Sequence, residues 1–355
     1  MIKNFDFVKY GESCAELNER ARSFLDEDML PVMQWTHGEG AYSGNCFDKK
    51  KMLKTQLDGI SETLATVNDH IPYLEPWHGV GVYAEAYGCP FLFVENDAPW
   101  TRLFVDNIKA LRQLQKPSID NSKMLKMVLE TTDYFISETN GLVRIAATDT
   151  QSPLSTLSLI CDVTWMLTEA MDYPEDFHRV LSDLTDLIIE FTLRQRALCP
   201  LAALPGHTMW SPDYMGGISV SDDMLALVGS DFYREFGLPY DQRIALELGG
   251  IGIHSCGNWF HNFESVKSVK NATMYDMTIS YACDPAPINP DKIISAFSGF
   301  ATPVQVRCHF SDLDKITKLI ESDVKLILSL YWDGDPSIRQ YQYDVIKAIK
   351  RRNRK

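Results

Sequence analysis

The chain repeats one pattern along most of its length: a short apolar run rich in β-forming residues, a polar or glycine-containing loop, and then an amphipathic helix. Eight such runs occupy residues 29–35, 71–77, 142–148, 201–210, 250–256, 272–278, 302–308 and 325–332. Their hydrophobicity is nearly continuous, which is typical of strands buried on both faces in a parallel sheet. The pattern therefore predicts an α/β fold with a parallel sheet.

Eight β-then-α units predict a (β/α)8 TIM barrel, and a doubly wound sheet is the alternative. Additional N-terminal helices are expected, because residues 1–28 are predicted to form a helical extension ahead of the barrel. Residues 80–140 are too long for one connection, so a long helical insertion is expected after strand 2. A barrel is one of the folds that organises 355 residues around a single core, and residues 1–355 are therefore predicted to form one domain.

The charge balance limits the partners that the chain can have. Its net charge of −14 excludes a broad basic surface, so neither a nucleic acid nor an anionic membrane is expected as a partner. No apolar stretch is long enough to span a bilayer, and the first residues lack the apolar core of a signal peptide. The eight cysteines are scattered without a secreted-domain spacing, which indicates reduced thiols and a cytoplasmic location.

In a (β/α)8 barrel the chemistry gathers at the carboxyl ends of the strands, so the last residues of each run are the first candidates for a site. These strand ends carry an unusual share of polar and aromatic side chains. They are His37, Glu75, Trp77, His78, Thr148, Asp149, His207, Trp210, His254, Cys256, Asp276, Cys308, His309, Trp332 and Asp333. The sequence therefore predicts a polar pocket at this end of the barrel, which would take a small-molecule substrate.

His254 and Cys256 lie two positions apart, so in a strand both side chains point to one face and can reach one metal ion. A buried thiol beside a buried imidazole is the other interpretation of such a pair. A zinc site needs a third ligand, and we expect Cys308 to supply it, with Cys283 as the next choice. With three protein ligands, zinc keeps an open position at which a thiol can bind and lose its proton.

Two further groups of residues are predicted to act on the substrate. Asp222 and Asp223 form a carboxylate pair ahead of a helix, suited either to proton transfer or to capping that helix, and His207 is a candidate proton donor. The remaining strand-end residues are predicted to contact the substrate, and the tryptophans among them would wall a pocket for a flat or apolar molecule. The predicted substrate-binding residues are Trp35, His37, Glu75, Trp77, Trp210, Asp276 and Trp332.

The stretch "GISVSDDMLALVGSDFYREFGLPYDQRIALELGGIGIHSCGN" (217–258) resembles the uroporphyrinogen decarboxylase superfamily, in particular its cobalamin-dependent methyltransferase branch. In that branch an acidic pair precedes S-x-x-x-Y/F-x-x-F-x-x-P, and a Gly-Gly strand leads into H-x-C-G. The segments "YAEAYGCPF" (83–91) and 152–191, with its paired helices and Pro-Glu, are also similar to the family. The resemblance covers roughly residues 70–335 and implies a (β/α)8 barrel.

The resemblance also implies an activity. Methyltransferases of this branch hold zinc on the H-x-C pair and a more distal cysteine, and the zinc activates a thiol that takes a methyl group from a corrinoid protein. His254 and Cys256 match the first two ligands. The family's third cysteine belongs near the last strand, where this chain reads "LSLYWDGDP". The Arg-rich motif of the decarboxylases is also missing, since the corresponding "VMQWTHGEGAY" contains no arginine.

The sequence therefore predicts a zinc-dependent methyltransferase that moves a methyl group between a corrinoid protein or a methylated small molecule and a thiol-type acceptor. Any corrinoid would be carried by the partner protein. The alternatives are a metal-free decarboxylase or lyase acting on a small carboxylic acid, and a non-catalytic accessory barrel. The sequence does not determine the methyl donor, the acceptor or the oligomeric state.

Overall fold

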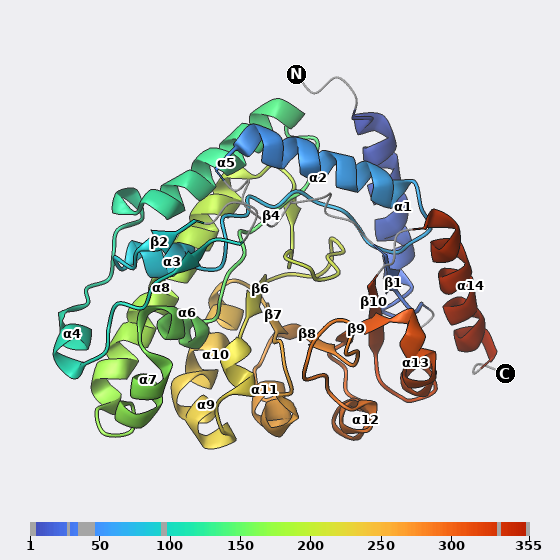
Figure 1. Ribbon diagram of the computed structural model, residues 1–355. Coiled ribbons are helices and arrows are strands. Elements are labelled where there is room, and N and C mark those ends of the chain that lie inside the picture. Colours follow the sequence, from blue (N-terminus) through green and yellow to red (C-terminus); the bar gives the residue numbers. More distant parts are fainter. Residues whose placement is uncertain (1–4, 27–28, 35–46, 94–97, 332–334, 353–355) are drawn as a thin grey trace.

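The computed structural model describes residues 5–26, 29–34, 47–93, 98–331 and 335–352. Its largest sheet has six parallel strands in the order β1-β10-β9-β8-β7-β6, so that strands consecutive from β6 to β10 are neighbours. These strands are β1 (Val32–Met33), β6 (Ile218–Ser221), β7 (Ile251–His254), β8 (Ala272–Thr278), β9 (Val304–His309) and β10 (Leu326–Tyr331). The order is that of a wall that curves around one axis (Figure 1).

Shorter parallel contacts continue this wall on the other side. β4 (Ile145–Ala146) pairs with β5 (Ala202–Ala203), and a single parallel bridge joins Leu74 to Ile145. Another parallel bridge joins Gln151 to Ser221 at the end of β6. The chain therefore has the predicted TIM-barrel-like α/β fold, with a continuous sheet from β6 through β10 to β1, and the short β4–β5 pair and single bridges on the other side.

Four of the predicted strands are much shorter in the structure or absent from it. Residues 71–77 contribute only the bridge at Leu74, and among the described residues the runs 29–35, 142–148 and 201–210 are strand only at β1, β4 and β5. The strand that precedes β7 in the sheet is β6, which lies in the segment "GISVS", outside the eight predicted runs. The glycine and two serines of this segment lower its hydrophobicity, so it was not predicted as a strand, yet all four residues of β6 are buried. The two predicted carboxylates, Asp222 and Asp223, therefore follow a barrel strand directly.

The helices cover the outside of the wall, and Figure 1 shows α9 to α13 arranged around β6 to β10. They comprise α6 (Pro153–Ile160), α7 (Val163–Glu169), α8 (Pro174–Leu198), α9 (Ser230–Phe236), α10 (Leu238–Glu247), α11 (Phe263–Lys267), α12 (Pro290–Phe297), α13 (Leu313–Ile320) and α14 (Pro336–Arg352). Short 3-10 turns η2 (Asp223–Ala226), η3 (Phe260–Asn262) and η4 (Phe310–Asp312) precede α9, α11 and α13. The longest helix, α8, begins at Pro174 with Glu175 and Asp176 in its first turn, where acidic side chains favour the helix dipole.

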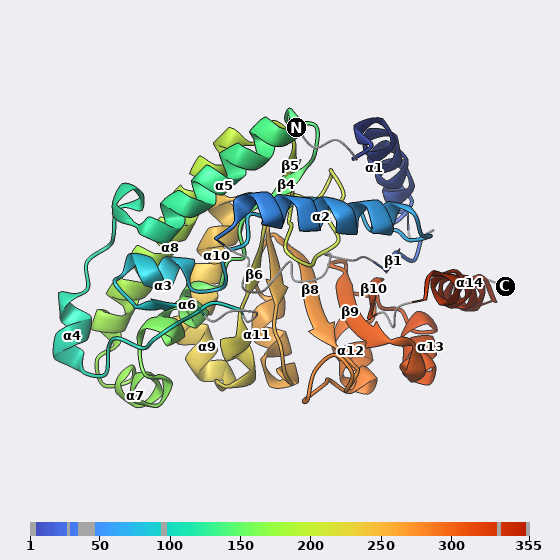
Figure 2. The ribbon, with the colours of Figure 1, turned by 45° about the horizontal axis from the view of Figure 1, so that its top comes forward.

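The predicted N-terminal helices and the insertion after strand 2 are both present. α1 (Phe7–Arg22) lies within the predicted extension 1–28, whereas α2 (Lys49–Leu64) follows β1 and was not part of it. Figure 2 shows α2 lying across one end of the strands. The insertion consists of α3 (Val82–Ala86), β2 (Phe91–Leu92), β3 (Trp100–Thr101), α4 (Ile108–Gln113), η1 (Ile119–Asn121) and α5 (Lys123–Thr139). β2 and β3 form a separate antiparallel pair.

Buried apolar side chains fill two regions. The larger one lies between the strands and the helices that follow them, and includes Val220, Ile253, Val306 and Leu328. The second packs α1 and α2 against the barrel through Tyr10, Leu57 and Trp210. Within the described residues, no helix combines the length and the apolar composition needed to cross a bilayer. The inner face of strands β7 to β9 carries the polar side chains His254, Asp276 and Gln305.

Candidate metal centre and active site

The register of three neighbouring strands places one layer of polar side chains inside the barrel. His254 at the end of β7 is opposite Asp276 of β8, and Asp276 is opposite Gln305 of β9. Residues opposite one another in a sheet point to the same face. His254 Nδ1 lies 2.5 Å from Asp276 Oδ1, and Gln305 Nε2 donates to Asp276 Oδ2 at 2.7 Å. The two oxygens of Asp276 are therefore committed to neighbouring side chains.

His254 is held in one orientation by this carboxylate. Burial and the charge of Arg307 lower its pKa, but the contact with Asp276 outweighs them, and the pKa of His254 is raised overall. Burial raises the pKa of Asp276, whereas Arg307 and His254 lower it further, and the net direction is down. A carboxylate that binds one ring nitrogen fixes the tautomer of a metal-binding histidine and leaves the other nitrogen for the ion. Nε2 is the free nitrogen here.

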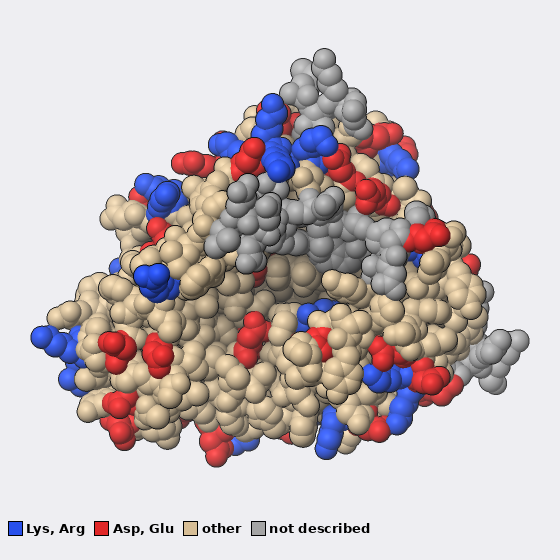
Figure 3. Space-filling model, viewed as in Figure 1, with Lys and Arg blue, Asp and Glu red and all other residues tan. Residues whose placement is uncertain are grey.

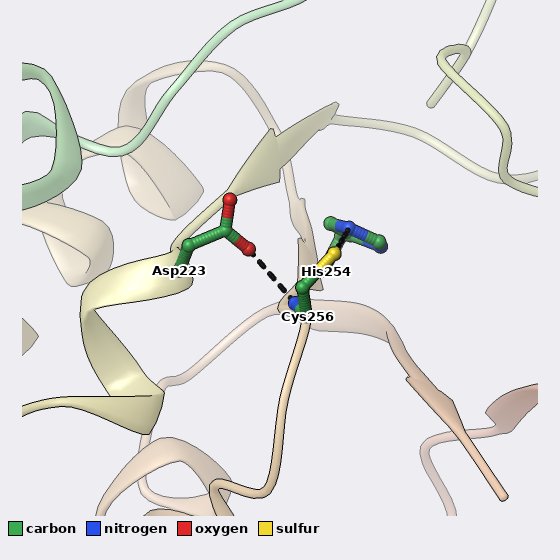
Figure 4. Close-up of side chains that lie close together, drawn as sticks. All are labelled: Asp223, His254 and Cys256. Carbon is green, nitrogen blue, oxygen red and sulfur yellow. Dashed lines mark hydrogen bonds between the residues drawn. The ribbon is translucent and has the colours of Figure 1, made fainter. Parts of the chain in front are cut away.

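Nε2 of His254 faces the thiol of Cys256. Their distance is 3.6 Å, and the backbone N–H of Cys256 donates to Asp223 Oδ1 at 2.8 Å. Ligand atoms of Asp223, His254 and Cys256 all lie within 4.8 Å of one another. Figure 4 shows the three side chains converging from the ends of β6 and β7. Cys256 and Asp223 are exposed and His254 is buried, so the group opens to the solvent on the side of the thiol and the Asp223 carboxylate.

Arg307 of β9 supplies a positive charge beside this group. Its Nε lies 2.9 Å from Asp276 Oδ1, and its Nη2 donates to the carbonyl oxygen of Ser255 at 3.3 Å. Burial lowers the pKa of the Arg307 guanidinium, but Asp276 and Cys256 raise it, so the net direction is up and the side chain is charged. Arg307 therefore balances the Asp276 carboxylate beside this group.

Asp222 lies behind the group and not in it. Its carboxylate accepts from Ser155 Oγ at 2.8 Å, and its backbone N–H donates to the carbonyl oxygen of His254 at 2.7 Å. Burial raises the pKa of Asp222 to about 6, against the lowering effect of the serine hydroxyls. The nearby Asp241, also buried, has its pKa raised by burial and by Asp222, and Tyr233 Oη donates to it at 2.7 Å. Asp222 thus supports the end of β6, whereas Asp223 faces the thiol.

A second polar group contains His207 and two carboxylates. His207 Nδ1 lies 3.0 Å from Glu75 Oε1, and its Nε2 lies 3.5 Å from Asp149 Oδ1. Burial lowers the pKa of His207, but Asp149 and Glu75 overcome this effect and raise it to about 10. Trp77 Nε1 donates to Asp149 Oδ2 at 3.2 Å. His207 is therefore a cation at neutral pH, able to donate a proton but not to accept one.

The predicted site residues separate into those that the structure brings together and those that it does not. His254 and Cys256 meet Asp223, while Glu75, Trp77 and His207 form the second group. Asp276, predicted to contact substrate, instead holds His254 and pairs with Arg307. Trp35, His37 and Trp332 lie outside the described residues.

Cys308 does not join His254 and Cys256. In β9 the side chains alternate, so that Gln305 and Arg307 point into the barrel and Cys308 points to the helix side, where it is fully buried in the apolar core. Burial raises its pKa well above the usual range. The predicted third ligand is therefore wrong. Cys283 is also outside the group of ligand atoms, and Asp223 occupies the third position.

Trp210 is another residue with a different place from the one predicted. Its side chain is fully buried, its Nε1 donates to the carbonyl oxygen of Asp69 at 2.9 Å, and its ring packs edge-on against Phe24. It belongs to the apolar region beneath α1 and does not wall a substrate pocket.

Sequence reasoning missed Arg307 and Gln305. The signal was present in "VQVRCH", where polar residues at 305 and 307 alternate with apolar residues at 304 and 306. Such alternation predicts a strand with one polar face. It also places Cys308 on the apolar face.

Comparison with known proteins identifies relatives of this chain. A family model described as uroporphyrinogen decarboxylase (URO-D) matches residues 77–198, which include the segment 83–91 and the paired helices of 152–191. Uroporphyrinogen decarboxylases of Xanthomonas campestris pv. campestris (strain B100) and Xanthomonas euvesicatoria pv. vesicatoria (strain 85-10) are each 27% identical over 215 residues. That alignment covers 56% of this chain, and it spans about half the length of these relatives, 55%.

A solved structure gives a likeness over almost the whole chain. A methyltransferase from Methanosarcina mazei is similar with a TM-score of 0.62 and 14% sequence identity, covering 95% of this chain and 98% of that chain. At this identity the likeness concerns the fold. Together with the family match, it confirms the resemblance to the uroporphyrinogen decarboxylase superfamily that the sequence predicted.

Proposed function

We propose that this protein is a zinc-dependent methyltransferase with a thiol-type acceptor. Its sequence is similar to the uroporphyrinogen decarboxylase superfamily, and its fold is similar to that of a methyltransferase. The observation that carries the proposal is the convergence of His254 Nε2, Cys256 Sγ and a carboxylate oxygen of Asp223. Imidazole, thiolate and carboxylate are the ligand types that zinc prefers, and catalytic zinc sites commonly use three protein ligands.

The surroundings of the group support the fit. Asp276 binds the ring nitrogen of His254 that faces away from Cys256, which is the arrangement found behind metal-binding histidines. The thiol of Cys256 is exposed, so a ligand can reach it from the solvent. Bound zinc would supply a Lewis acid that lowers the pKa of an acceptor thiol.

The residues around the group would orient the metal ligands and balance their charge. Arg307 neutralises Asp276, and Asp276 in turn keeps His254 Nε2 directed at Cys256. The methyl group would pass from its donor to the acceptor sulfur, the leaving group would keep the electron pair of the broken bond, and the thiol proton would go to solvent. A corrinoid protein is the proposed methyl donor, with a methylated small molecule as the other source.

Zinc content tests the metal part of the proposal. The protein, purified anaerobically and supplied with zinc, is expected to hold about one ion per chain. Cys256→Ala should lose it with the fold intact, and Asp223→Asn should lower zinc affinity while still accepting the Cys256 N–H bond. Cys308→Ala is the matched control and should retain the ion, because Cys308 lies on the opposite face of β9. A metal-free wild-type protein would contradict the proposal.

Methyl transfer tests the reaction. Methylcobalamin and 2-mercaptoethanol are the probes, and formation of the methyl thioether, measured by mass spectrometry, is the readout. Turnover should require zinc and Cys256. It should be unchanged in Cys199→Ala, since Cys199 follows the end of α8 and its thiol donates to the carbonyl oxygen of Gln195, away from the group of ligand atoms.

A metal-free decarboxylase or lyase for a small carboxylic acid is the second candidate, because His207 is charged at neutral pH. It could protonate the carbanion left when carbon dioxide departs. Carbon dioxide release by zinc-free protein, abolished in His207→Gln, would favour this function over methyl transfer.

A further inference from the structure

The group formed by Glu75, His207 and Asp149 has more negative than positive charge. One imidazolium lies between two carboxylates, at 3.0 Å from Glu75 and 3.5 Å from Asp149. All three side chains are buried or nearly so. A buried carboxylate oxygen is costly unless a hydrogen-bond donor or a cation compensates it, and within this group the oxygen to consider is Oδ1 of Asp149.

Asp149 also has an unused acceptor. The residue is 3% exposed, and its Oδ2 accepts from Trp77 Nε1 at 3.2 Å. Its Oδ1 has no hydrogen-bond partner among the described residues, although His207 Nε2 lies 3.5 Å away. Buried carboxylate oxygens are rarely left without a donor, so a donor from outside the chain is expected at this position.

This acceptor belongs to the same interior as the metal group. Gln305 Nε2 donates both to Asp276 Oδ2 at 2.7 Å and to the carbonyl oxygen of Thr208 at 3.1 Å, directly after His207. Asp276 also influences the protonation of His207. Figure 3 shows this face of the molecule hollowed at its centre. The two polar groups are therefore joined inside the barrel through Gln305.

No described cation of the site is available to bind an anion at Asp149. Arg307 is paired with Asp276, and His207 is shared by two carboxylates. The charge pattern thus favours a cationic ligand group and opposes a carboxylate or sulfonate next to Asp149.

We propose that Asp149 binds a protonated amino group of the substrate, so that the acceptor of the proposed methyl transfer is an aminothiol. The N–H of the ammonium would donate to Asp149 Oδ1 while the sulfur lies at the Asp223, His254 and Cys256 group. The inference rests on the proposed function for the role of the sulfur, but the amine site itself can be tested without any reaction.

Binding of simple amines tests the site directly. The probes are propylammonium, N,N,N-trimethylpropylammonium and 1-propanol, added to the Cys256→Ala protein and measured by calorimetry. Propylammonium should bind at least about tenfold more tightly than the other two, because only it has both charge and an N–H donor. Equal binding of the trimethylated probe would overturn the hydrogen bond to Asp149.

Asp149→Asn is the variant that removes the charge and keeps the shape. The preference for propylammonium should fall by about tenfold, while Asp133→Asn, on the exposed face of α5, should leave it unchanged. A preference that persists in Asp149→Asn would overturn the assignment. If the variant does not fold, the comparison of the three probes on the Cys256→Ala protein still decides the proposal.

Turnover supplies the last comparison. With zinc and methylcobalamin, kcat/KM for 3-aminopropane-1-thiol should exceed that for 3-mercaptopropan-1-ol by about tenfold, and 3-mercaptopropionate should be poorer than both. Equal rates would overturn the aminothiol acceptor. If no thiol is methylated but propylammonium binds at Asp149, the proposed function fails and the amine site stands. If thiols are methylated without any preference for an amine, the amine site fails and the proposed function stands.

Discussion

At the scale of single residues, the contact between His254 and Asp276 is expected to set the zinc affinity of the candidate metal centre. Both side chains are buried, and Asp276 has no oxygen left for a substrate. The sequence predicted His254 and Cys256 from their spacing alone, because two positions in a strand share a face. It could not assign Asp276 to His254, since that contact depends on the register between β7 and β8.

Asp276→Asn should therefore weaken zinc binding without removing a ligand. The amide keeps the volume but cannot hold His254 as a carboxylate does, and loss of such a supporting group costs roughly 10- to 100-fold in affinity. Competition with a chromophoric chelator measures the change. Asp291→Asn, at the start of α12, is the control and should bind zinc as the wild type does. Unchanged affinity in Asp276→Asn would contradict the supporting role.

The charge of His207 gives a pH prediction. Its pKa in the folded protein is raised to about 10, above the value of an unfolded histidine near 6.5. The stabilisation from this imidazolium is therefore complete below about pH 6.5 and is lost as the pH rises through about 10. NMR of labelled histidine, with the His207 signal assigned by its loss in His207→Gln, should show that ring still protonated at pH 8. Glu75→Gln should lower its pKa, and a His207 ring that titrates near 6.5 in the wild type would contradict the arrangement.

At the scale of elements, the strands with long apolar runs were predictable and the short ones were not. Residues 272–278 and β8 coincide, since a continuous apolar run is a strong signal. β6 has only four residues, among them two serines, and was missed because its burial comes from the neighbouring β7 and not from its own composition. The polar face of β9 was predictable from the alternation of apolar and polar residues, but the run 302–308 was predicted from its hydrophobicity alone.

Gly217, directly before β6, tests the close approach of β6 to β7. Its φ is +87°, and a Cβ there would lie 2.2 Å from the backbone of Gly250. Gly217→Ala should destabilise the protein by roughly 3 kcal/mol or more, because the strain and the clash involve backbone atoms. Gly11→Ala in α1 meets no described atom within 4 Å and should stabilise by about 0.5–1 kcal/mol. Urea unfolding measures both, and similar values would contradict the prediction.

At the scale of the whole molecule, Asp69 links segments that are far apart in the sequence. Its carboxylate accepts from the backbone N–H of Val32 at 3.0 Å and from Tyr343 Oη at 3.2 Å, lies 2.8 Å from Lys347 Nζ, and pairs with Arg20. α1, β1 and α14 thereby meet at one buried side chain. The sequence indicated a barrel but contained no signal for this closure, because each of its members is an ordinary polar residue.

Asp69→Asn should destabilise the whole fold. It leaves Lys347 and Arg20 without their buried partner, and breaking such a pair costs roughly 3–5 kcal/mol. Asp58→Asn removes an exposed pair with Lys54 on α2 and should change stability by about 0.5 kcal/mol or less. Urea unfolding of both variants checks the difference, and an equally small effect at Asp69 would show that the two ends of the chain are held together elsewhere.

The two polar groups of the interior come from different parts of the chain. Glu75, Asp149 and His207 all precede β6, whereas Asp223, His254, Cys256, Asp276 and Arg307 all follow it. Gln305 bridges the two sets through the Thr208 carbonyl oxygen and Asp276. In the proposed arrangement, substitutions at Glu75, Asp149 or His207 would therefore change which molecule binds, while the metal-ligand group of the second half stays intact. Selectivity and metal binding would then be separable by mutation.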